Sequence, residues 1–454
     1  MFAFYDLETT GTNPAFDQVI QFAGILTDDD LRPQDRINIR CRLSPHILPA
    51  PWAMAVTGVS PEILTDPTLP SLFDFTQTLT KLIKRWGPAT WVGYNSISFD
   101  EEMLRQALYQ NLHPNFYLTQ LDGNQRLDIM KLVYSTWELA PEAVIWPTDD
   151  QGRHSFKLDR LAPANGFEHH DAHDALGDVE ATMHIAKLIR DKAPEVWDQA
   201  LRNRSKHDVN ALLESGQPLR LVERFGAAPP RSFIGALAGR NPENLNAVGF
   251  IDLQTTDPEQ LAGQGDDAIA NALSATPKMI RTITVNKCPS LYTVDDVVPE
   301  ISRRADALNG MSDFHRRVGQ ALAGRYADRE EPAYMEQRIY GGFYSNADRR
   351  LVDQFQSGDW PERLQLCQQF GDDRLRELGS RLIFLNTPDL LDAAVQGHWS
   401  GMIHERWNSS DSDVPWMTLD KAADQLAEIE ASGQMPEAQF SNLVDFYYDL
   451  IGSG

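Results

Sequence analysis

The stretch FAFYDLETTGT, residues 2–12, decides how the first part of the chain folds. Its first seven residues are rich in aromatic and apolar side chains, as in a buried strand, and the turn formers of residues 9–14 end that strand. Side chains alternate across a strand, so one face carries Phe2, Phe4, Asp6 and Glu8 in that order. A core-facing side that turns acidic needs a partner for its charges, such as a metal ion.

The elements that follow this strand predict a mixed α/β domain. Apolar runs and turn residues predict strands over 19–27 and 37–43, so that the first three strands form an antiparallel meander. Helical spacing predicts helices over 72–86, from about 100, and from about 173 to 192, and a short apolar strand over 90–94. Strands that come first and helices that are interleaved later are typical of this fold class.

The rest of the chain reads differently, and its 454 residues exceed what one hydrophobic core usually supports. Residues 193–345 contain short β-rich runs, at 247–253 and 279–285, and helices around 301–322, whereas residues 346–454 are almost wholly helical in pattern. We therefore expect three domains, namely 1–192, 193–345 and 346–454.

Composition limits the setting in which the chain works. No apolar run approaches the roughly 20 residues of a membrane span, and the start of the sequence lacks the pattern of an export signal. The three cysteines, Cys41, Cys288 and Cys367, are widely separated and form no CxxC pair. We expect a cytoplasmic protein with no membrane association and no structural zinc.

The net charge of −24 argues, at first sight, against a nucleic-acid partner. Residues 193–345, however, carry 17 Lys and Arg against 20 Asp and Glu, which leaves room for a basic groove with aromatic platforms for single strands. The candidates in and near this part are Arg202, Arg204, Lys206, Arg303, Arg304, Phe314, Arg316, Arg317, Arg325, Tyr326, Arg338 and Tyr340. Solvated helix faces are the alternative interpretation of the same residues.

Three further acidic or basic positions extend the pair Asp6 and Glu8. Asp100 follows the strand 90–94, and a parallel pairing of that strand with the first would bring Asp100 towards Asp6. His173 and Asp178 open the last helix of the domain, with Asp178 beside its apolar stripe. Each position alone also fits a helix cap, a dipole partner or a solvated strand end, and that is the role expected for the neighbouring Glu101 and Glu102.

Together, the order and spacing of these residues resemble the DEDDh exonucleases, which have a ribonuclease H-like fold. The surrounding words agree, among them YDLETTGT at 5–12, GYN at 93–95 and HDA at 173–175. Within that superfamily the chain resembles the exodeoxyribonuclease I family, and the resemblance extends through NPEN at 241–244, NKCP at 286–289 and GFYSNAD at 342–348. It implies a ribonuclease H-like mixed-sheet exonuclease domain, a small SH3-like β domain and a helical C-terminal domain.

The resemblance also implies an activity: 3′-to-5′ hydrolysis of single-stranded DNA to 5′-mononucleotides, in DNA repair and recombination, by two Mg²⁺ ions for which Mn²⁺ can substitute. Asp6, Glu8 and Asp178 would hold the ion that activates water, and Asp6 would bridge to a second ion held by Asp100. His173 would be the general base, since the usual pKa of histidine lies near working pH.

For the substrate, the resemblance implies that Leu7, Glu8, Thr9, Thr10 and Asn95 meet the terminal nucleotide. Lys157 would reach a phosphate, although the family commonly has arginine there, whose planar fork lysine lacks. The implied partners are single-stranded DNA and the acidic tail of a single-strand DNA-binding protein, and the chain is expected to be a monomer. Two alternatives stay open: a DEDDh exonuclease that acts on RNA or in proofreading, and a catalytically silent single-strand-binding scaffold.

Overall fold

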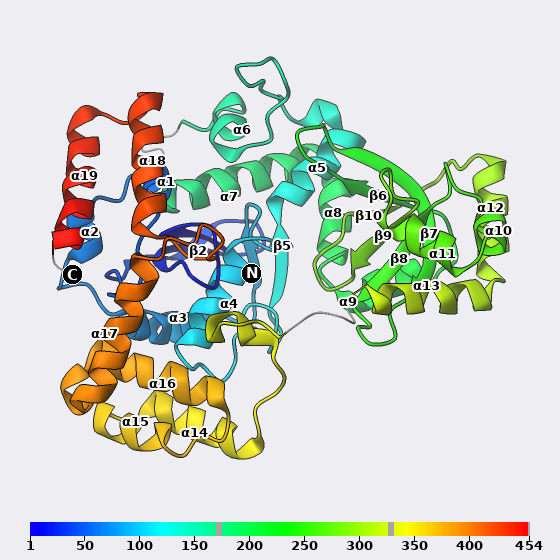
Figure 1. The fold of residues 1–454 in the computed structure, drawn as a ribbon. Helices are drawn as coiled ribbons and strands as arrows, with labels where there is room; N and C mark the ends of the chain where they lie inside the picture. The colour runs from blue at the N-terminus through cyan, green and yellow to red at the C-terminus, as the bar shows by residue number, and fades with distance from the viewer. Residues whose placement is uncertain (169–174, 326–330, 453–454) are drawn as a thin grey trace.

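The computed structural model describes residues 1–168, 175–325 and 331–452, and arranges them as three neighbouring parts (Figure 1). The first part is built on a five-stranded mixed sheet of order β3-β2-β1-β4-β5. Strands β1, β2 and β3 pair antiparallel, which confirms the predicted meander, and β4 pairs parallel with both β1 and β5. The strands are β1 Phe2–Thr9, β2 Val19–Thr27, β3 Pro33–Arg40, β4 Thr90–Gly93 and β5 Gln125–Asp128.

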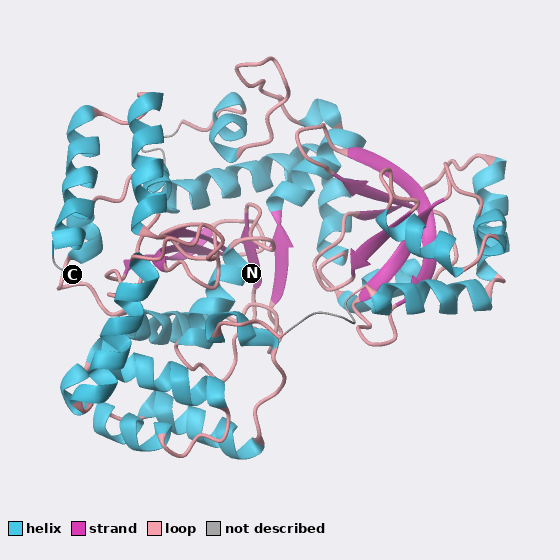
Figure 2. Cartoon of the chain, viewed as in Figure 1, coloured by secondary structure: helices cyan, strands magenta, loops and turns pink. Residues whose placement is uncertain are grey.

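Helices cover both faces of this sheet, as the ribbon coloured by secondary structure shows (Figure 2). Phe2 and Phe4 face one core, which α5 and α7 help to close, and Ala3, Tyr5 and Leu7 face another, beneath α3 and α4. The alternation predicted for β1 is therefore confirmed. The helices of this part are α1 Pro51–Thr57, α2 Pro61–Thr65, α3 Leu72–Trp86, α4 Asp100–Gln110, α5 Ile129–Leu139, the 3₁₀-helix η1 Pro141–Ala143, α6 Leu158–Ala164 and α7 Ala175–Lys192.

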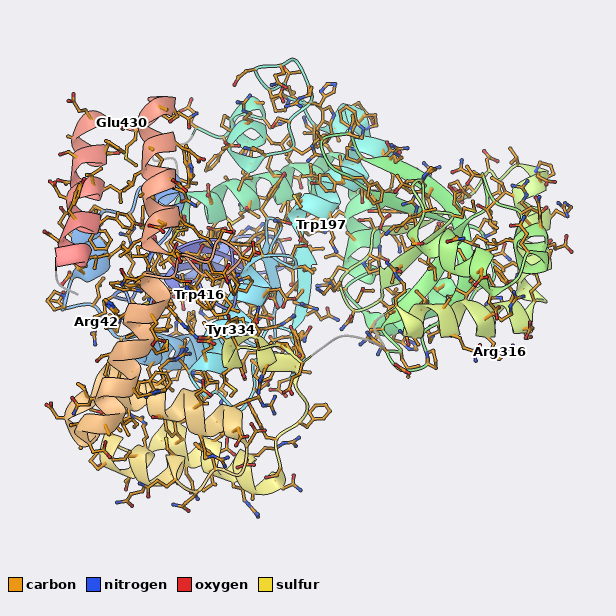
Figure 3. The ribbon with its side chains drawn as sticks, viewed as in Figure 1. Arg42, Trp197, Arg316, Tyr334, Trp416 and Glu430 are labelled. Carbon is orange, nitrogen blue, oxygen red and sulfur yellow. The ribbon has the colours of Figure 1, made fainter. Side chains whose placement is uncertain are left out.

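The first core continues into the next helix, α8 Pro194–Arg202. Trp197 of α8 is 4% exposed and its ring lies 5.8 Å from that of Phe2, with 49° between the ring planes. Figure 3 shows Trp197 where the first part meets the middle one. Helix α8, which lies beyond residue 192, therefore contributes to the core under β1. The division into domains at 192 and 345 stays a prediction.

The middle part contains a five-stranded antiparallel sheet of order β10-β6-β7-β8-β9 with helices around it. The sequence predicted β8, β9 and the helical stretch but gave no sign of β6 and β7. That the sheet forms an SH3-like barrel stays a prediction. Its elements are α9 Lys206–Leu213, β6 Leu219–Glu223, β7 Arg231–Arg240, β8 Ala247–Asp252, α10 Pro258–Gly263, α11 Asp266–Ser274, β9 Ile280–Thr284, β10 Leu291–Thr293, α12 Pro299–Asn309 and α13 Ser312–Gly324.

The last part is helical, as expected, and two apolar clusters fasten it to the first part. One joins Phe73 and Tyr109 to Phe355 and Leu378, and the other joins Met54 to residues of the last two helices. None of the helices in the described part of the chain combines the length and the apolar character that crossing a bilayer requires. The elements are η2 Met335–Tyr340, α14 Asn346–Ser357, α15 Trp360–Cys367, α16 Asp373–Asn386, η3 Pro388–Leu390, α17 Ala393–Trp407, α18 Leu419–Ser432 and α19 Glu437–Gly452.

The burial of Trp197 gives a testable expectation for the first core. Trp197→Ala removes a buried indole from the contact with Phe2 and should lower the free energy of unfolding by about 3–5 kcal/mol, as large-to-small changes in cores do. Denaturant unfolding measures this. Tyr448→Ala is the control, since that ring is 68% exposed and its loss should change stability little. Equal stability of the two variants would contradict the assignment of α8 to this core.

Candidate active site

Three carboxylates from two elements meet at the end of β1. Asp6 and Glu8 come from the face of β1 that also carries Phe2 and Phe4, and Asp178 comes from the first turn of α7. One carboxylate oxygen of each lies within 4.8 Å of the others. The structure therefore brings together three of the residues that the sequence singled out, and α7 places Asp178 at the rim of its buried face as predicted.

Asp100 reaches the same strand from the other side of the sheet. Because β4 runs parallel to β1, the chain leaves β4 beside the end of β1, and Asp100 opens α4 there. The backbone N–H of Leu7 donates to Asp100 Oδ1 over 3.2 Å, so this carboxyl lies against the backbone between Asp6 and Glu8. The predicted approach of Asp100 to Asp6 is confirmed.

Burial and mutual repulsion shift the protonation of these groups. Burial, followed by the charges of Asp100, Glu8 and Asp178, raises the pKa of Asp6 well above its usual range. Burial raises the pKa of Asp100 to about 7, although hydrogen bonds from backbone N–H groups, including that of Leu7, oppose the shift. Charged carboxylates at these positions need compensation by a cation.

The donor set fits hard divalent cations. Every group in the cluster is a carboxylate, and the oxygens of Asp6, Glu8 and Asp178 lie close enough together to share one ion. Oxygen ligands of this kind suit Mg²⁺ and Mn²⁺ rather than zinc. The site can therefore hold a divalent metal, as the exonuclease family generally requires. His173, the expected general base, lies outside the described residues.

The end of β1 and the first residue of the loop after it contain the residues expected to meet the terminal nucleotide. Leu7, Glu8 and Thr9 are mostly buried, and the Thr9 hydroxyl donates to the carbonyl of Gly11 over 2.7 Å. Thr10 is fully buried, and its hydroxyl accepts from the backbone N–H of Gln18 over 2.8 Å. These bonds give Thr10 a role in shaping the loop, while its contact with substrate stays a prediction.

Asn95 and Lys157 lie on segments that are fastened near the ends of β4 and β5. Asn95 has a positive φ of 63° and is held by its backbone N–H, which donates to Asp128 Oδ1 over 3.0 Å. Tyr94 donates its hydroxyl to the carbonyl of Phe156, and the next residue, Lys157, is exposed at the start of α6. Asp128 is a supporting residue that the sequence did not reveal, because the four-residue strand before it is too short to show a pattern.

Glu101 lies in the first turn of α4, where a dipole partner was expected, and its burial was not foreseen. It is 2% exposed and forms the centre of a buried network. Tyr5 and Thr119 donate their hydroxyls to Glu101 over 2.8 Å each. Two guanidinium groups complete the network: Arg105 lies 3.4 Å and Arg126 3.3 Å from Glu101 Oε2. The bond between Tyr5 and Glu101 thus links the residue before Asp6 to the residue after Asp100.

Comparisons with known proteins agree with this geometry. Residues 3–186 match a family model described as exonuclease, and residues 333–448 match one described as the exonuclease I C-terminal domain. The exodeoxyribonuclease I of Haemophilus influenzae is 31% identical over 413 residues, which cover 83% of this chain and 84% of the relative. The chain belongs to the exodeoxyribonuclease I family. As a member it is a 3′-to-5′ exonuclease that acts on single-stranded DNA.

Solved structures of relatives match the whole described architecture. Exonuclease I of E. coli in complex with a dA16 oligonucleotide superposes with a TM-score of 0.84 at 28% identity, covering 100% of this chain and 99% of that one. A structure of SSB/Exonuclease I in complex with an inhibitor superposes with a TM-score of 0.83 at 27% identity, covering 100% of this chain and 99% of the other. The family resemblance therefore extends over all three parts of the chain.

Several arginines of the predicted basic groove have acidic neighbours in the structure, and the groove itself stays a prediction. Arg303 and Arg304 pair with Glu300, and Arg316 pairs with Asp313 at the far side of the middle part (Figure 3). Arg317 and Arg338 also have acidic neighbours. Phe314 is 2% exposed and belongs to the core, so it cannot be a stacking platform, and Tyr326 lies outside the described residues. Local pairing of this kind favours the interpretation as solvated helix faces.

The raised pKa of Asp100 predicts how the metal-free protein responds to pH. A carboxyl whose folded pKa exceeds its unfolded value loses its stabilising contribution as pH rises from about 4 to about 7. Asp100→Asn cannot ionise and its Oδ1 can still accept from Leu7. In EDTA at pH 8, the melting temperature of Asp100→Asn should exceed that of the parent protein by a few degrees, because a pKa of about 7 in place of about 4 is worth roughly 4 kcal/mol. The difference should narrow as the pH falls towards 4. Parallel melting curves of the two proteins across this range would contradict the shift.

Proposed function

We propose that the cluster of Asp6, Glu8, Asp100 and Asp178 is the catalytic centre of this exonuclease and hydrolyses the terminal phosphodiester at the 3′ end of single-stranded DNA. The observation that carries the proposal is the convergence of three carboxylates within 4.8 Å at the end of β1, with Asp100 on the backbone between two of them. The products are 5′-mononucleotides, released in DNA repair and recombination.

The proposed cofactor is Mg²⁺, with two ions at the site, and Mn²⁺ is the expected substitute. Asp6, Glu8 and Asp178 would hold one ion, and Asp6 and Asp100 the other. When bound, the ions supply an activated water and compensation for the charge that develops on the phosphate and the departing 3′ oxygen. The raised pKa of Asp6 supports this assignment, because its main causes, burial and three neighbouring carboxyls, are those that a cation would offset.

The chain's own groups orient the substrate and move the proton. We assign the general base to His173 by its place in the family motif, five residues before Asp178. Leu7, Glu8 and Thr9 would contact the terminal nucleotide, Asn95 would lie nearby and Lys157 would reach a phosphate. The exposure of Lys157 supports the proposed phosphate contact, because a flexible ammonium group in solvent can bind a phosphate as a point charge.

The proposed partners are single-stranded DNA and a single-strand DNA-binding protein, and the proposed assembly state is a monomer. Relatives in complexes with a dA16 oligonucleotide and with SSB support the two partners. Because Arg303, Arg304, Arg316, Arg317 and Arg338 have acidic neighbours, we name none of these five as a contact for either partner. A preference for RNA is the alternative that a substrate assay excludes or establishes.

Metal dependence is the first test of the proposed site. Alanine at Asp6, Glu8, Asp100 or Asp178 should lower the rate of nucleotide release at least about 100-fold, as loss of a group that stabilises developing charge does, and EDTA should abolish the activity of the parent protein. Glu195→Ala, an exposed acid of α8, is the control and should stay active. More than a tenth of the parent activity in Asp100→Ala would disprove the two-ion assignment. His173→Ala should lose activity yet still bind the metal.

Polarity and substrate class are tested with labelled oligonucleotides. A strand labelled at its 5′ end should shorten one nucleotide at a time, and a strand with a blocked 3′ terminus should persist. Single-stranded DNA, single-stranded RNA and blunt duplex DNA of the same sequence are compared in one experiment, and only the first should be degraded rapidly. Equal degradation of RNA would overturn the assignment of the substrate but leave the metal site intact.

A further inference from the structure

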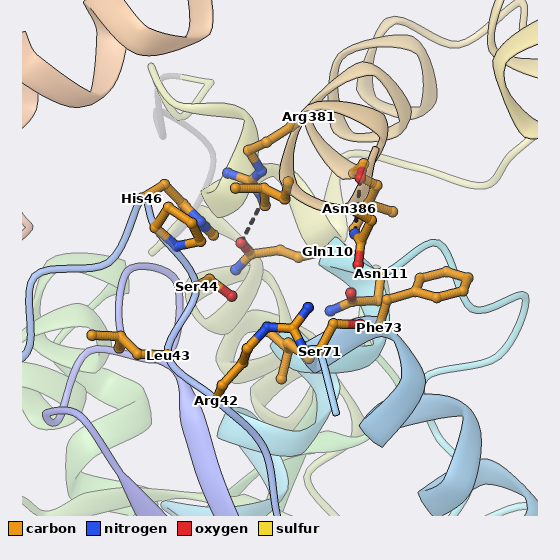
Figure 4. Close-up of a pocket in the computed structure, with 14 residues that line it drawn as sticks. Arg42, Leu43, Ser44, His46, Ser71, Phe73, Gln110, Asn111, Arg381 and Asn386 are labelled. Atoms are coloured by element: carbon orange, nitrogen blue, oxygen red, sulfur yellow. Dashed lines mark hydrogen bonds between the residues drawn. The ribbon is translucent and has the colours of Figure 1, made fainter. Parts of the chain in front are cut away.

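A cavity of about 40 Å³ separates the first part of the chain from helix α16 of the last part (Figure 4). Its polar lining comes from the loop after β3, the end of α4 and one face of α16, and includes Arg42, Ser44, His46, Asn111, Arg381 and Asn386. No aspartate or glutamate is among its lining residues in the described part of the chain. Two arginines therefore line the cavity without an acid in its wall, although the chain has a net charge of −24.

Buried nitrogens at this cavity lack partners. Arg381 is 4% exposed and His46 is 8% exposed, and neither Arg381 Nε nor His46 Nδ1 has a hydrogen-bond partner among the described residues. A buried donor without a partner costs about 1–3 kcal/mol, and native structures leave few of them. In Figure 4 the side chains of Arg381 and Arg42 enter the cavity from opposite sides.

The positive charge around the cavity is only partly compensated. Arg381 and Arg406 both pair with Glu336 Oε1, at 2.6 Å and 2.8 Å, so one carboxylate serves two guanidinium groups. Arg42 donates to the carbonyl of Leu69 over 2.7 Å and makes no ion pair with the described residues. Burial, and then the charge of Arg381, lowers the pKa of His46 well below its usual range, so the ring stays neutral. This positive charge disfavours a cation and favours an anion, although the buried Asn111 Oδ1 at the same cavity is an acceptor that also lacks a partner among the described residues.

We propose that this cavity is a binding site for a small phosphate-type oxyanion, seated between Arg42 and Arg381. Guanidinium N–H groups form charge-assisted hydrogen bonds with oxyanions, and oxygens in several directions are needed to reach donors on opposite walls. At Arg381 the donor without a partner among the described residues is Nε, because Nη1 donates to Glu336 and Nη2 to Gln110. The volume corresponds to roughly three water molecules, so the ligand is a free ion or the phosphate end of a larger one. Its two sources are inorganic phosphate and a nucleoside 5′-monophosphate, the product class of the proposed reaction.

The position of the site gives it a structural consequence. Arg381 donates to Gln110 Oε1 over 2.7 Å, and Gln110 donates in turn to the carbonyl of Ala15 over 3.0 Å, in the loop after β1. An anion held by Arg42 of the first part and Arg381 of the last part bridges the two. Its binding therefore stabilises the docking of the C-terminal helices on the nuclease sheet, independently of catalysis.

The test is thermal melting of the full chain in EDTA at constant ionic strength, with chloride, inorganic phosphate or dTMP as the added anion. Phosphate should raise the midpoint above its value in chloride by on the order of 3 °C at saturating concentration. Arg42→Gln, at the partly exposed mouth, should lose most of this shift and weaken phosphate binding at least tenfold in calorimetry, and Arg42→Lys should show an intermediate shift. Arg85→Gln, an exposed arginine of the adjacent α3, should respond like the parent protein.

The outcomes separate the possible occupants. A shift with inorganic phosphate that Arg42→Gln removes supports the site for the free ion, and a shift with dTMP alone that the same variant removes supports the mononucleotide. The same shift in the parent protein and in Arg42→Gln would overturn the proposal. So would equal midpoints in chloride and in both phosphate compounds, because the cavity would then hold only water or a halide.

Discussion

The repulsion among buried carboxylates at the end of β1 is the constraint on which the rest of the structure depends. Asp6 is surrounded by Glu8, Asp100 and Asp178, and burial removes the water that would screen these charges. Without a cation the cluster favours protonation, as the pKa of about 7 for Asp100 indicates. The folded chain thus stores an unfavourable arrangement that a divalent ion relieves, and the surrounding packing must be stable enough to hold it.

The buried network of Glu101 provides part of that rigidity. A carboxylate that is 2% exposed is tolerated because two guanidinium groups and two hydroxyls approach it. Tyr5 and Glu101 are the chain neighbours of Asp6 and Asp100, so the bond between Tyr5 and Glu101 helps to fix the distance between the two proposed metal ligands. The two guanidinium groups compensate only part of the charge of Glu101, which still contributes to raising the pKa of Asp100.

The features that could be predicted from the sequence are those that depend on residues close together in the chain. The alternation in β1 and the helical spacing of α3 and α7 are local patterns, so these elements and the carboxylates on them were predictable. Strand β5 has four residues, and β6 and β7 carry no clear alternation, so their pairing depends on tertiary packing and could not be predicted. The burial of Glu101 could not be predicted for the same reason: in the sequence it is an acid at a helix start, and its partners Tyr5 and Arg126 lie 96 and 25 residues away.

Helix α4 connects Asp100, a proposed metal ligand, with parts of the chain that lie hundreds of residues away. Its first residue is Asp100, and the next, Glu101, pairs with Arg126, which also donates to the carbonyl of Asn286 over 2.7 Å. Glu102 then pairs with Lys287 at 3.4 Å and accepts from the Tyr340 hydroxyl over 2.9 Å.

At the other end of α4, the Tyr109 hydroxyl donates to the carbonyl of Met335 over 2.8 Å, and Gln110 accepts from Arg381. Successive residues of one helix therefore contact the middle part and the last part while its first residue lies at the active site. A shift of either part must be transmitted to α4, and through α4 to Asp100. The middle and C-terminal parts thus help to fix the position of a proposed metal ligand.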